Sequence, residues 1–194
     1  RDNHPDSALH VVVGAFEEID VAAISPGAFD MVTAATSFHW VPPDVGLARC
    51  ADLLRPGGWL ALWWNVFGDD SRPDPFHEAL QPLLERRAPQ LIDHDAGGVG
   101  AHPHALDVDL RRAEIDATGR FGQAHHELIR WTGRHTTTEI RAMFASFSPW
   151  LAIEPGLRNS LLDDLAAIAD DEFDGLVERP YVTSLYLAPR MDDR

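Results

Sequence analysis

A strand, a helix, a turn and a second strand follow one another between residues 29 and 66, and this run constrains the fold most. Phe29–Ala35 is a short apolar segment of the kind that parallel sheets bury. Asp44 caps a helix that the turn Arg55–Gly58 stops, and Trp59–Val66 follows at once as a second apolar strand. This order is typical of a βαβ crossover, so the sequence predicts an α/β fold.

The rest of the chain adds weaker signals on both sides of this unit. Leu9–Val13 is rich in β-branched residues and predicts an earlier strand that ends at Gly14. Asp74 begins a helix that Pro82 should kink or interrupt, and residues 90–110 are expected to be mostly loop. The later expected elements are a strand over His126–Trp131, a helix after the capping box of Thr136 and Glu139, an amphipathic helix over Leu157–Ile168 and a strand over Tyr181–Leu187. Antiparallel strands at the end would make the sheet mixed.

Composition excludes several classes of protein. The 194 residues, 45% hydrophobic and 24% charged, fit one globular domain over 1–194. Thirty-one acids and sixteen bases give a net charge of -15, which would repel a nucleic-acid backbone. Every one of the sixteen bases is Arg, so chemistry that depends on a lysine is excluded.

Cysteine usage and hydropathy indicate the cellular setting. The one cysteine, Cys50, cannot form an internal disulfide, which favours a reducing compartment and a cytoplasmic location. The longest strongly apolar run, Trp59–Phe67, is less than half of the ~20 residues that a bilayer span needs. We therefore expect no membrane partner.

Three motifs in order resemble the small-molecule methyltransferases of class I, often described as methyltransferase type 11. They are Val13–Glu18 with its glycine and acids, Phe29–Trp40 with a Phe-Asp-x-Val strand ending in Ser-Phe-His-Trp, and Leu53–Gly58 with its Pro-Gly-Gly turn. The resemblance runs from about residue 8 to the end of the chain. It implies a Rossmann-like, mostly parallel sheet with an antiparallel C-terminal strand, and S-adenosylmethionine as cofactor.

The resemblance fails at the front of the chain. Family members begin with a strand, a glycine-rich loop, a helix and a second strand, and this βαβα portion is absent before Arg1. In the family's strand order, 3-2-1-4-5-7-6, the absent strands would lie between Leu9–Val13 and Phe29–Ala35. We expect a longer native protein, direct pairing of these two strands, or a strand swapped from another chain, and we favour the first.

The resemblance also implies where a site would lie. Gly14, Ala15, Phe16 and Glu17 would lie beside the adenine, although Glu17 with Glu18 also fits a solvated loop. Ala34, Ala35 and Thr36 stand at the end of a strand, where α/β sheets bind ligands, and complete the expected cofactor contacts. The residues expected to line the acceptor side are Ser37, Phe38, Trp40, Trp64 and Asn65. His39 is the candidate base, with packing beside Trp40 as the alternative.

Two functions remain open from the sequence. The first is a methyltransferase acting on a small organic molecule; the second is a catalytically inactive binding or assembly module, with a homodimer or a strand-swapped dimer as its form. A metal site at His94, His102 and His104 is disfavoured, because that stretch has no regular structure to fix ligand geometry. We therefore predict no metal.

Overall fold

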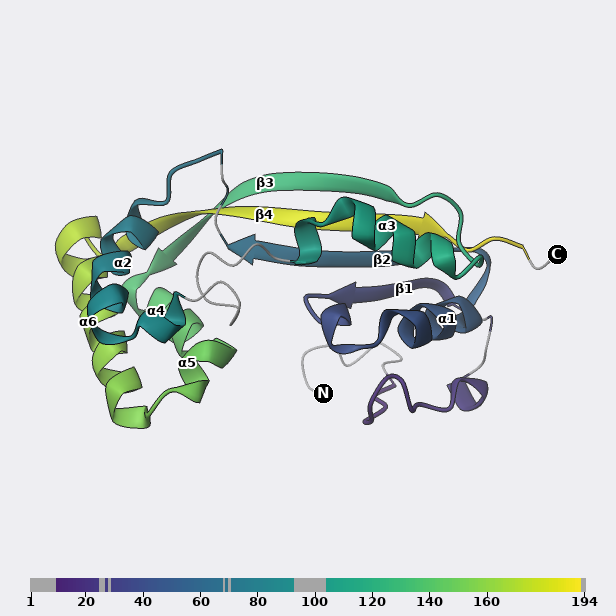
Figure 1. The fold of residues 1–194 in the computed structure, drawn as a ribbon, viewed down its shortest axis with the longest axis horizontal. Coiled ribbons are helices and arrows are strands. Elements are labelled where there is room, and N and C mark those ends of the chain that lie inside the picture. Colours follow the sequence, from purple (N-terminus) through teal and green to yellow (C-terminus); the bar gives the residue numbers. More distant parts are fainter. Residues whose placement is uncertain are drawn as a thin grey trace.

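A mixed four-stranded sheet organises the molecule. The computed structural model describes residues 10–24, 27, 29–67, 69, 71–92 and 104–192. Its strands are β1 (Phe29–Ala35), β2 (Leu54–Phe67), β3 (His125–Thr136) and β4 (Leu176–Pro189), in the order β1-β2-β4-β3. β1 is parallel to β2, whereas β4 is antiparallel to both β2 and β3 (Figure 1). The predicted α/β class with an antiparallel C-terminal strand is confirmed.

The βαβ unit forms as the sequence predicts, except that Asp44 does not cap its helix: the N-cap is Pro42, and Asp44 lies in the first turn. Helix α1 (Pro43–Leu53) connects β1 to β2, and the strand Phe29–Ala35 has the predicted bounds. The predicted turn Arg55–Gly58 lies within the first residues of β2, which begins at Leu54, and it needs its glycines: Gly57 has a φ of 72°, and a Cβ on Gly58 would lie 2.9 Å from the carbonyl oxygen of Arg55. This tight turn lets the chain leave α1 and enter the sheet directly.

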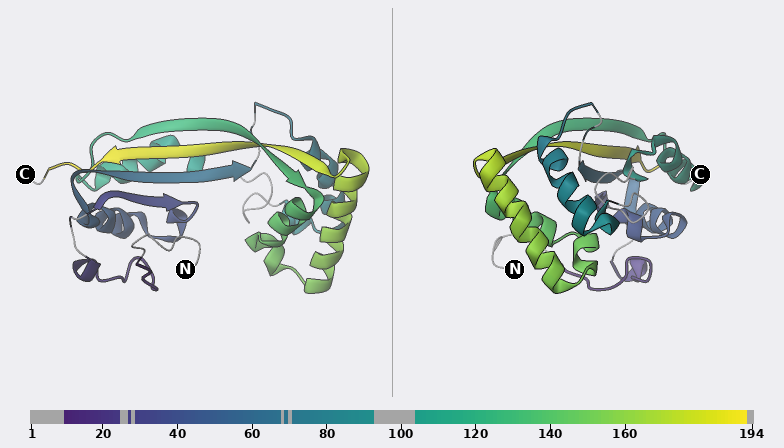
Figure 2. Two further views of the ribbon diagram at one scale, coloured as in Figure 1. Left: turned by 180° about the vertical axis from the view of Figure 1, so that it is seen from behind. Right: turned by 60° about the vertical axis from the view of Figure 1, so that its left-hand side comes forward.

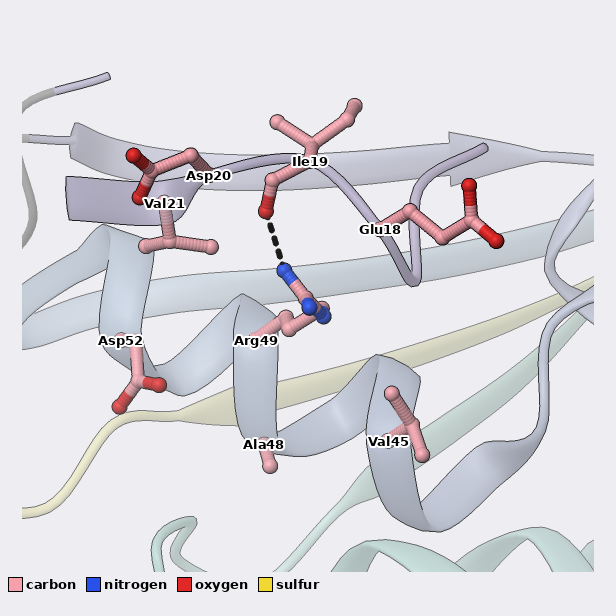
Figure 3. A pocket seen from close by; sticks show the side chains of 8 residues that line it. All are labelled: Glu18, Ile19, Asp20, Val21, Val45, Ala48, Arg49 and Asp52. Atoms are coloured by element: carbon pink, nitrogen blue, oxygen red, sulfur yellow. Dashed lines mark hydrogen bonds between the residues drawn. The ribbon is translucent and has the colours of Figure 1, made fainter. Parts of the chain in front are cut away.

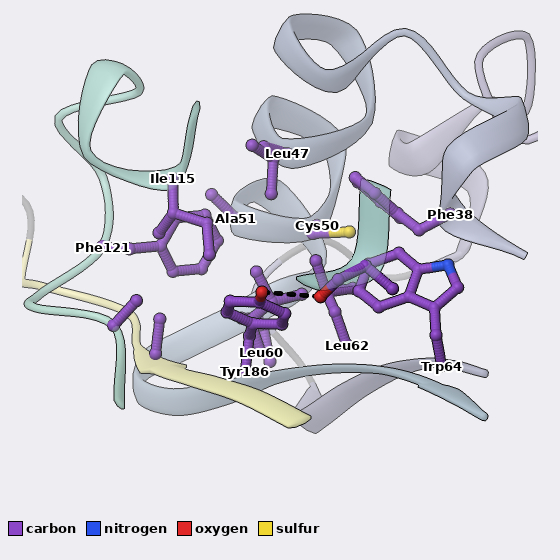
Figure 4. Close-up of a cluster of buried hydrophobic side chains, with 14 of the residues drawn as sticks. Phe38, Leu47, Cys50, Ala51, Leu60, Leu62, Trp64, Ile115, Phe121 and Tyr186 are labelled. Carbon is purple, nitrogen blue, oxygen red and sulfur yellow. Dashed lines mark hydrogen bonds between the residues drawn. The ribbon is translucent and has the colours of Figure 1, made fainter. Parts of the chain in front are cut away.

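One face of the sheet is covered by helices α1 and α3 (Val108–Ala117), as Figure 1 shows. Side chains alternate along each strand, so Leu60, Leu62 and Trp64 of β2 point to this covered face together with Tyr186 of β4. Figure 4 shows this core, in which these four side chains are at most 6% exposed.

A second core lies at the far end of the molecule, among helices (Figures 1 and 2). The helices are α2 (Pro75–Arg87), α4 (Thr137–Ala145), α5 (Ser148–Ala152) and α6 (Pro155–Phe173). Phe76, Phe144, Trp150, Leu161 and Leu165 are all at most 1% exposed there. The predicted capping box is present, since Thr136 accepts from the Glu139 amide and the Glu139 carboxylate accepts from the Thr136 amide. Short 3₁₀ helices complete the described elements: η1 (Val21–Ile24), η2 (Phe38–Trp40), η3 (Pro89–Leu91) and η5 (His104–Leu106).

A two-stranded ribbon joins the two cores. β2 pairs with β4 from Trp59↔Pro189 to Phe67↔Tyr181, and beyond that point the segment Leu176–Pro180 pairs with Thr132–Thr136 of β3. Both strands of the ribbon therefore continue out of the sheet toward the helical core (Figure 1). We call these two segments the ribbon.

The predicted strand Leu9–Val13 is wrong wherever the structure describes it. His10–Val13 has no strand structure, and Val11, Val12 and Val13 are 59%, 56% and 94% exposed. A strand needs a neighbour for its N–H and C=O groups, and in the described part of the chain β1 pairs with β2 alone. Direct pairing of this segment with β1 therefore does not occur there.

Two other elements differ from the expectation. Helix α3 was not expected, and it begins at Val108, at the end of the stretch 90–110 that was expected to be mostly loop. Helix α2 is not interrupted at Pro82, although a proline inside a helix costs about 3 kcal/mol. Burial of one apolar side chain contributes about 1.5–3 kcal/mol, and α2 buries a whole apolar face, which offsets that cost. No helix in the described part of the chain has the length and hydropathy that crossing a membrane requires.

Candidate functional site

The C-terminal ends of β1 and β2 lie side by side and form the centre of the candidate site. Ala35 is the register partner of Trp63, and the amide of Thr36 donates to the carbonyl oxygen of Trp63 at 2.8 Å. Thr36 then takes a left-handed backbone, with a φ of 49°, and its hydroxyl accepts from the amide of Asn65 at 3.4 Å. These contacts fix the point at which the chain leaves the sheet, where open α/β sheets bind ligands.

The residues at this edge are small or exposed. Ala34 is half-buried beside the core of the covered face, and Ala35 and Thr36 are exposed. Because the side chains of Ala34, Ala35 and Thr36 are small, a ligand can approach the backbone of these residues. The structure thus places these three predicted cofactor residues together.

The loop Gly14–Glu17 forms a compact turn. The amides of Glu18 and Ile19 both donate to the carbonyl oxygen of Ala15, at 2.9 and 3.1 Å. Phe16 is half-buried and packs against the core of the covered face, as do Val32 and Ala34. A Cβ on Gly14 would make only an ordinary contact of 3.7 Å with Ile19, so the fold itself does not require glycine there.

The turn after β1 presents a histidine held by a buried tryptophan. Ser37 precedes η2, and His39 is exposed, with its ring centroid 4.8 Å from that of Trp40, which is 73% exposed. The indole N–H of Trp64 donates to Nδ1 of His39 at 3.1 Å. An indole nitrogen can only donate, so Nδ1 must be unprotonated and neutral His39 carries its proton on Nε2.

Asn65 is held by two residues that the sequence analysis missed. The hydroxyl of Thr183 donates to Oδ1 of Asn65 at 2.8 Å, and the indole N–H of Trp131 donates to the Thr183 hydroxyl at 3.0 Å. This chain of hydrogen bonds fixes the amide oxygen of Asn65, so its NH₂ group points the other way. The pairing spans 118 residues, and only the cross-strand register could have revealed it.

Two residues expected to line the acceptor side belong to the core instead. Phe38 is 4% exposed and Trp64 is 6% exposed, and both rings point into the cluster in Figure 4. Alternation along β2 places Trp64 on the covered face and Trp63 on the opposite face. Trp64 therefore contacts the site only by the hydrogen bond from its indole N–H to His39, and the rest of its ring packs in the core.

A surface hollow of about 450 Å³ lies elsewhere, between the segment Glu18–Val21 and the outer side of α1 (Figure 3). Its walls include Asp52 of α1 and Arg49, whose guanidinium donates to the carbonyl oxygen of Ile19. None of the site residues expected from the sequence lines this hollow. The hollow lies between a loop and a helix, whereas the candidate site lies at the ends of two strands.

The described residues contain no group of three or more metal-ligating side chains close enough to hold an ion. His94 and His102 lie outside the described residues, as does the side chain of His104. The expected absence of a metal stays a prediction.

The sheet has the fold of one class of protein, the Rossmann-like methyltransferases. The order β1-β2-β4-β3, with β4 antiparallel, corresponds to strands 4-5-7-6 of the arrangement that the motifs implied. A proposed type II methyltransferase from Anaeromyxobacter dehalogenans has the same fold: the TM-score is 0.56 at 14% identity, over 94% of this chain and 72% of that one.

Sequence comparison agrees with this class. Residues 1–62 match the model of the methyltransferase domain family, so the resemblance found in the motifs is confirmed for this part of the chain. A ubiquinone biosynthesis O-methyltransferase of Albidiferax ferrireducens is 27% identical over 142 residues, which cover 68% of this chain and 52% of that protein. An uncharacterized methyltransferase of Mycobacterium bovis is 38% identical over 55 residues, 28% of this chain and 21% of that protein. The chain thus spans about half the length of the first relative and less of the second.

Proposed function

We propose that the protein takes part in S-adenosylmethionine-dependent methyl transfer to a small organic molecule. The observation that supports this most directly is the parallel pair β1 and β2, whose carboxyl ends bear Ala35, Thr36 and the turn Ser37–Trp40 within a methyltransferase fold. The name of the Albidiferax ferrireducens relative supports a small-molecule acceptor. Cys50 is a free, buried thiol, and a chain without a disulfide in its described residues fits a reducing compartment such as the cytoplasm.

The residues at the strand ends fit one side of such a cofactor. S-adenosylmethionine supplies a methyl group on a sulfonium, so the protein's task is to bind, orient and exclude water. Exposed Ala35 and Thr36 leave the backbone accessible, and the turn Gly14–Glu17 provides a second stretch of accessible backbone. We assign the cofactor contacts to these two segments.

His39 and Asn65 would orient the methyl acceptor. Because Trp64 occupies Nδ1, neutral His39 offers an N–H donor at Nε2, and it can take up a proton only by giving up the Trp64 hydrogen bond. Asn65 offers its amide NH₂, because Thr183 holds the oxygen. Two donors at one sheet edge suit an acceptor molecule that has a carbonyl, carboxylate or phenolate oxygen. The role of His39 as a base stays a prediction.

The proposal can be tested by nuclear magnetic resonance with S-adenosylhomocysteine as the probe. We expect amide shifts to change at Gly14–Glu17 and Ala34–Thr36 as the probe is titrated. Ala35→Phe fills the accessible space and should abolish these changes, whereas Ala113→Phe, on the exposed side of α3, should leave them intact.

Affinity provides a second criterion. Because the described residues contact the cofactor from one side, we expect a dissociation constant above roughly 100 µM, worth less than about 6 kcal/mol. The proposed cofactor site would be contradicted if the amide shifts changed only at other surfaces. It would also be contradicted if Ala35→Phe left the shift changes at Gly14–Glu17 and Ala34–Thr36 as they are.

A further inference from the structure

Three hydrogen-bonded side chains connect the strands β3, β4 and β2 and end at the candidate site (Figure 1). Asn65 of β2 is directly opposite Thr183 of β4 in the register, and Trp131 lies beyond Thr183, in β3. The indole N–H of Trp131 donates to the Thr183 hydroxyl at 3.0 Å, and this hydroxyl donates to Oδ1 of Asn65 at 2.8 Å. We call Trp131, Thr183 and Asn65 the relay.

The relay has one direction, and Trp131 sets it. An indole nitrogen can only donate, so the Thr183 oxygen must accept from Trp131. The single hydroxyl proton of Thr183 is then donated to Asn65, which offers its oxygen to receive it. In the described part of the chain nothing accepts from the amide NH₂ of Asn65, so this group is open to a ligand. Without the indole, the Thr183 oxygen could accept from that NH₂ group instead, and the Asn65 amide could turn over.

A buried tyrosine holds the indole of Trp131 in place. The rings of Trp131 and Tyr181 are stacked, with centroids 4.5 Å apart and an angle of 16° between their planes. Tyr181 is 3% exposed, and its hydroxyl lies 2.8 Å from Nε2 of His135. Gly133 makes this packing possible, because a Cβ at that position would lie 2.5 Å from Cε2 of Tyr181. The indole N–H therefore has a fixed direction, and so has the Thr183 hydroxyl that it controls.

The direction of the relay determines which ligand atom Asn65 can bind. An outward NH₂ group binds an unprotonated oxygen and offers nothing to an N–H donor. Neutral His39, at the same sheet edge, has the same preference because its free N–H is at Nε2. A carboxylate or phenolate satisfies both donors with charge-assisted hydrogen bonds, whereas an ammonium or amidinium group satisfies neither. The chain's net charge of -15 attracts cations, so a preference for an anionic oxygen has to come from local donors of this kind.

We propose that Trp131 is a positioning residue that sets the specificity for the methyl acceptor. Through Thr183 it turns the NH₂ group of Asn65 outward, and the site thereby selects an acceptor that presents an unprotonated oxygen. This role rests on the proposed function, because it places Asn65 on the acceptor side. It adds a residue two strands away from Asn65 that acts on the acceptor only through its neighbours.

Two probes of the same shape and opposite hydrogen-bonding character test this role. Benzoate has two acceptor oxygens, and benzamidinium has N–H donors in the same positions. Each is titrated without cofactor in about 0.15 M salt, which limits long-range attraction. Nuclear magnetic resonance follows the side-chain NH₂ signal of Asn65. We expect benzoate to bind there at least about tenfold more tightly than benzamidinium.

Four variants separate the relay from general packing. Trp131→Phe removes the indole N–H and should reduce the preference for benzoate to about twofold or less. Thr183→Val keeps the shape without the hydroxyl and should have the same effect, whereas Thr183→Ser keeps the hydroxyl and should retain the preference. Trp59→Phe is the matched control, because Trp59 of β2 is 43% exposed against 39% for Trp131 and lies outside the relay. Packing alone would change stability and leave the probe preference as it is.

Three results would overturn the role of Trp131. They are no response of the Asn65 signal to either probe, equal affinity for both probes in the unchanged chain, and an unchanged preference in Trp131→Phe. Equal losses in Trp131→Phe and Trp59→Phe would also overturn it, because the relay does not include Trp59. Failure of the methyl-transfer proposal is recognised separately: S-adenosylhomocysteine would then leave the amide shifts at Ala34–Thr36 unchanged while the preference for benzoate stays.

Discussion

The buried ion pair between Asp74 and Arg179 should be the most sensitive point of the helical core. Arg179 of β4 donates to the Asp74 carboxylate at 2.6 Å, with the two side chains 3% and 9% exposed. The guanidinium also lies over the rings of Phe76 and Phe144, at 5.9 and 5.6 Å. Asp74 has a second task, because its other oxygen accepts from the His77 amide and caps α2. Replacing Asp74 therefore removes two separable contributions.

The two contributions differ in size. Loss of an N-cap costs about 1 kcal/mol, and leaving a buried guanidinium without its carboxylate costs about 3–5 kcal/mol. Asp74→Ala loses both, or about 4–6 kcal/mol, whereas Asp74→Asn retains a good cap and loses about 3–5 kcal/mol. Combining Asp74→Asn with Arg179→Met should restore most of the loss, because an apolar replacement of a buried pair is often neutral.

Urea denaturation provides the measurement. Far-UV circular dichroism reports on unfolding of the helical core, because α2, α4, α5 and α6 hold most of the α-helical residues in the described part of the chain. The reasoning is refuted if Asp74→Ala and Asp74→Asn each cost less than about 1 kcal/mol, or if adding Arg179→Met to Asp74→Asn makes stability worse.

Further predictions concern caps, protonation and thiol access. Thr136→Ala removes half of the capping box of α4 and should cost about 1 kcal/mol in thermal denaturation; Thr138→Ala, in the same turn, should cost less. Burial lowers the pKa of His135 from its ordinary value of 6.5, so the unfolded chain binds protons first as pH falls. Stability should thus decline below about pH 6.5, and His135→Asn should reduce that decline; an unchanged pH profile in this variant would contradict it. Cys50 should react with a thiol reagent only on unfolding, because it is 2% exposed and its pKa is raised to about 12. For His39, ¹⁵N shifts should show Nδ1 unprotonated in the neutral ring, and Trp64→Phe should remove that preference.

Local sequence signals predicted the elements whose own residues determine them. The apolar run Phe29–Ala35 became β1 with the same bounds, and Thr136 with Glu139 formed the expected cap. The strand expected over Tyr181–Leu187 was found, but as β4 it extends to Leu176–Pro189. Of the added residues, Leu176–Pro180 pair with β3 and Ala188–Pro189 pair with β2, and such pairing is not visible in a local window.

Elements that depend on distant neighbours were predicted poorly. His10–Val13 is rich in β-branched residues, but in the described residues it pairs with no strand. The strand that its composition predicted is therefore not formed there. At the site, the local pattern predicted that Ala34–Thr36 lie where β1 ends, yet it could not tell which tryptophan of β2 faces the core. That choice depends on register, and register also determines the contact of Thr183 with Asn65.

The ribbon between the two cores has a consequence for how the molecule melts. A two-stranded segment is stable in water only when it packs against another element, and for Leu176–Pro180 with Thr132–Thr136 that packing comes from the helical core, in which Val177 is fully buried. The ribbon should therefore melt with the helical core, and heat should divide the molecule where the ribbon leaves β2. A calorimetric scan should contain two overlapping peaks, and the measured enthalpy should exceed the van't Hoff value, as in a protein whose halves lose cooperativity before either is fully unfolded.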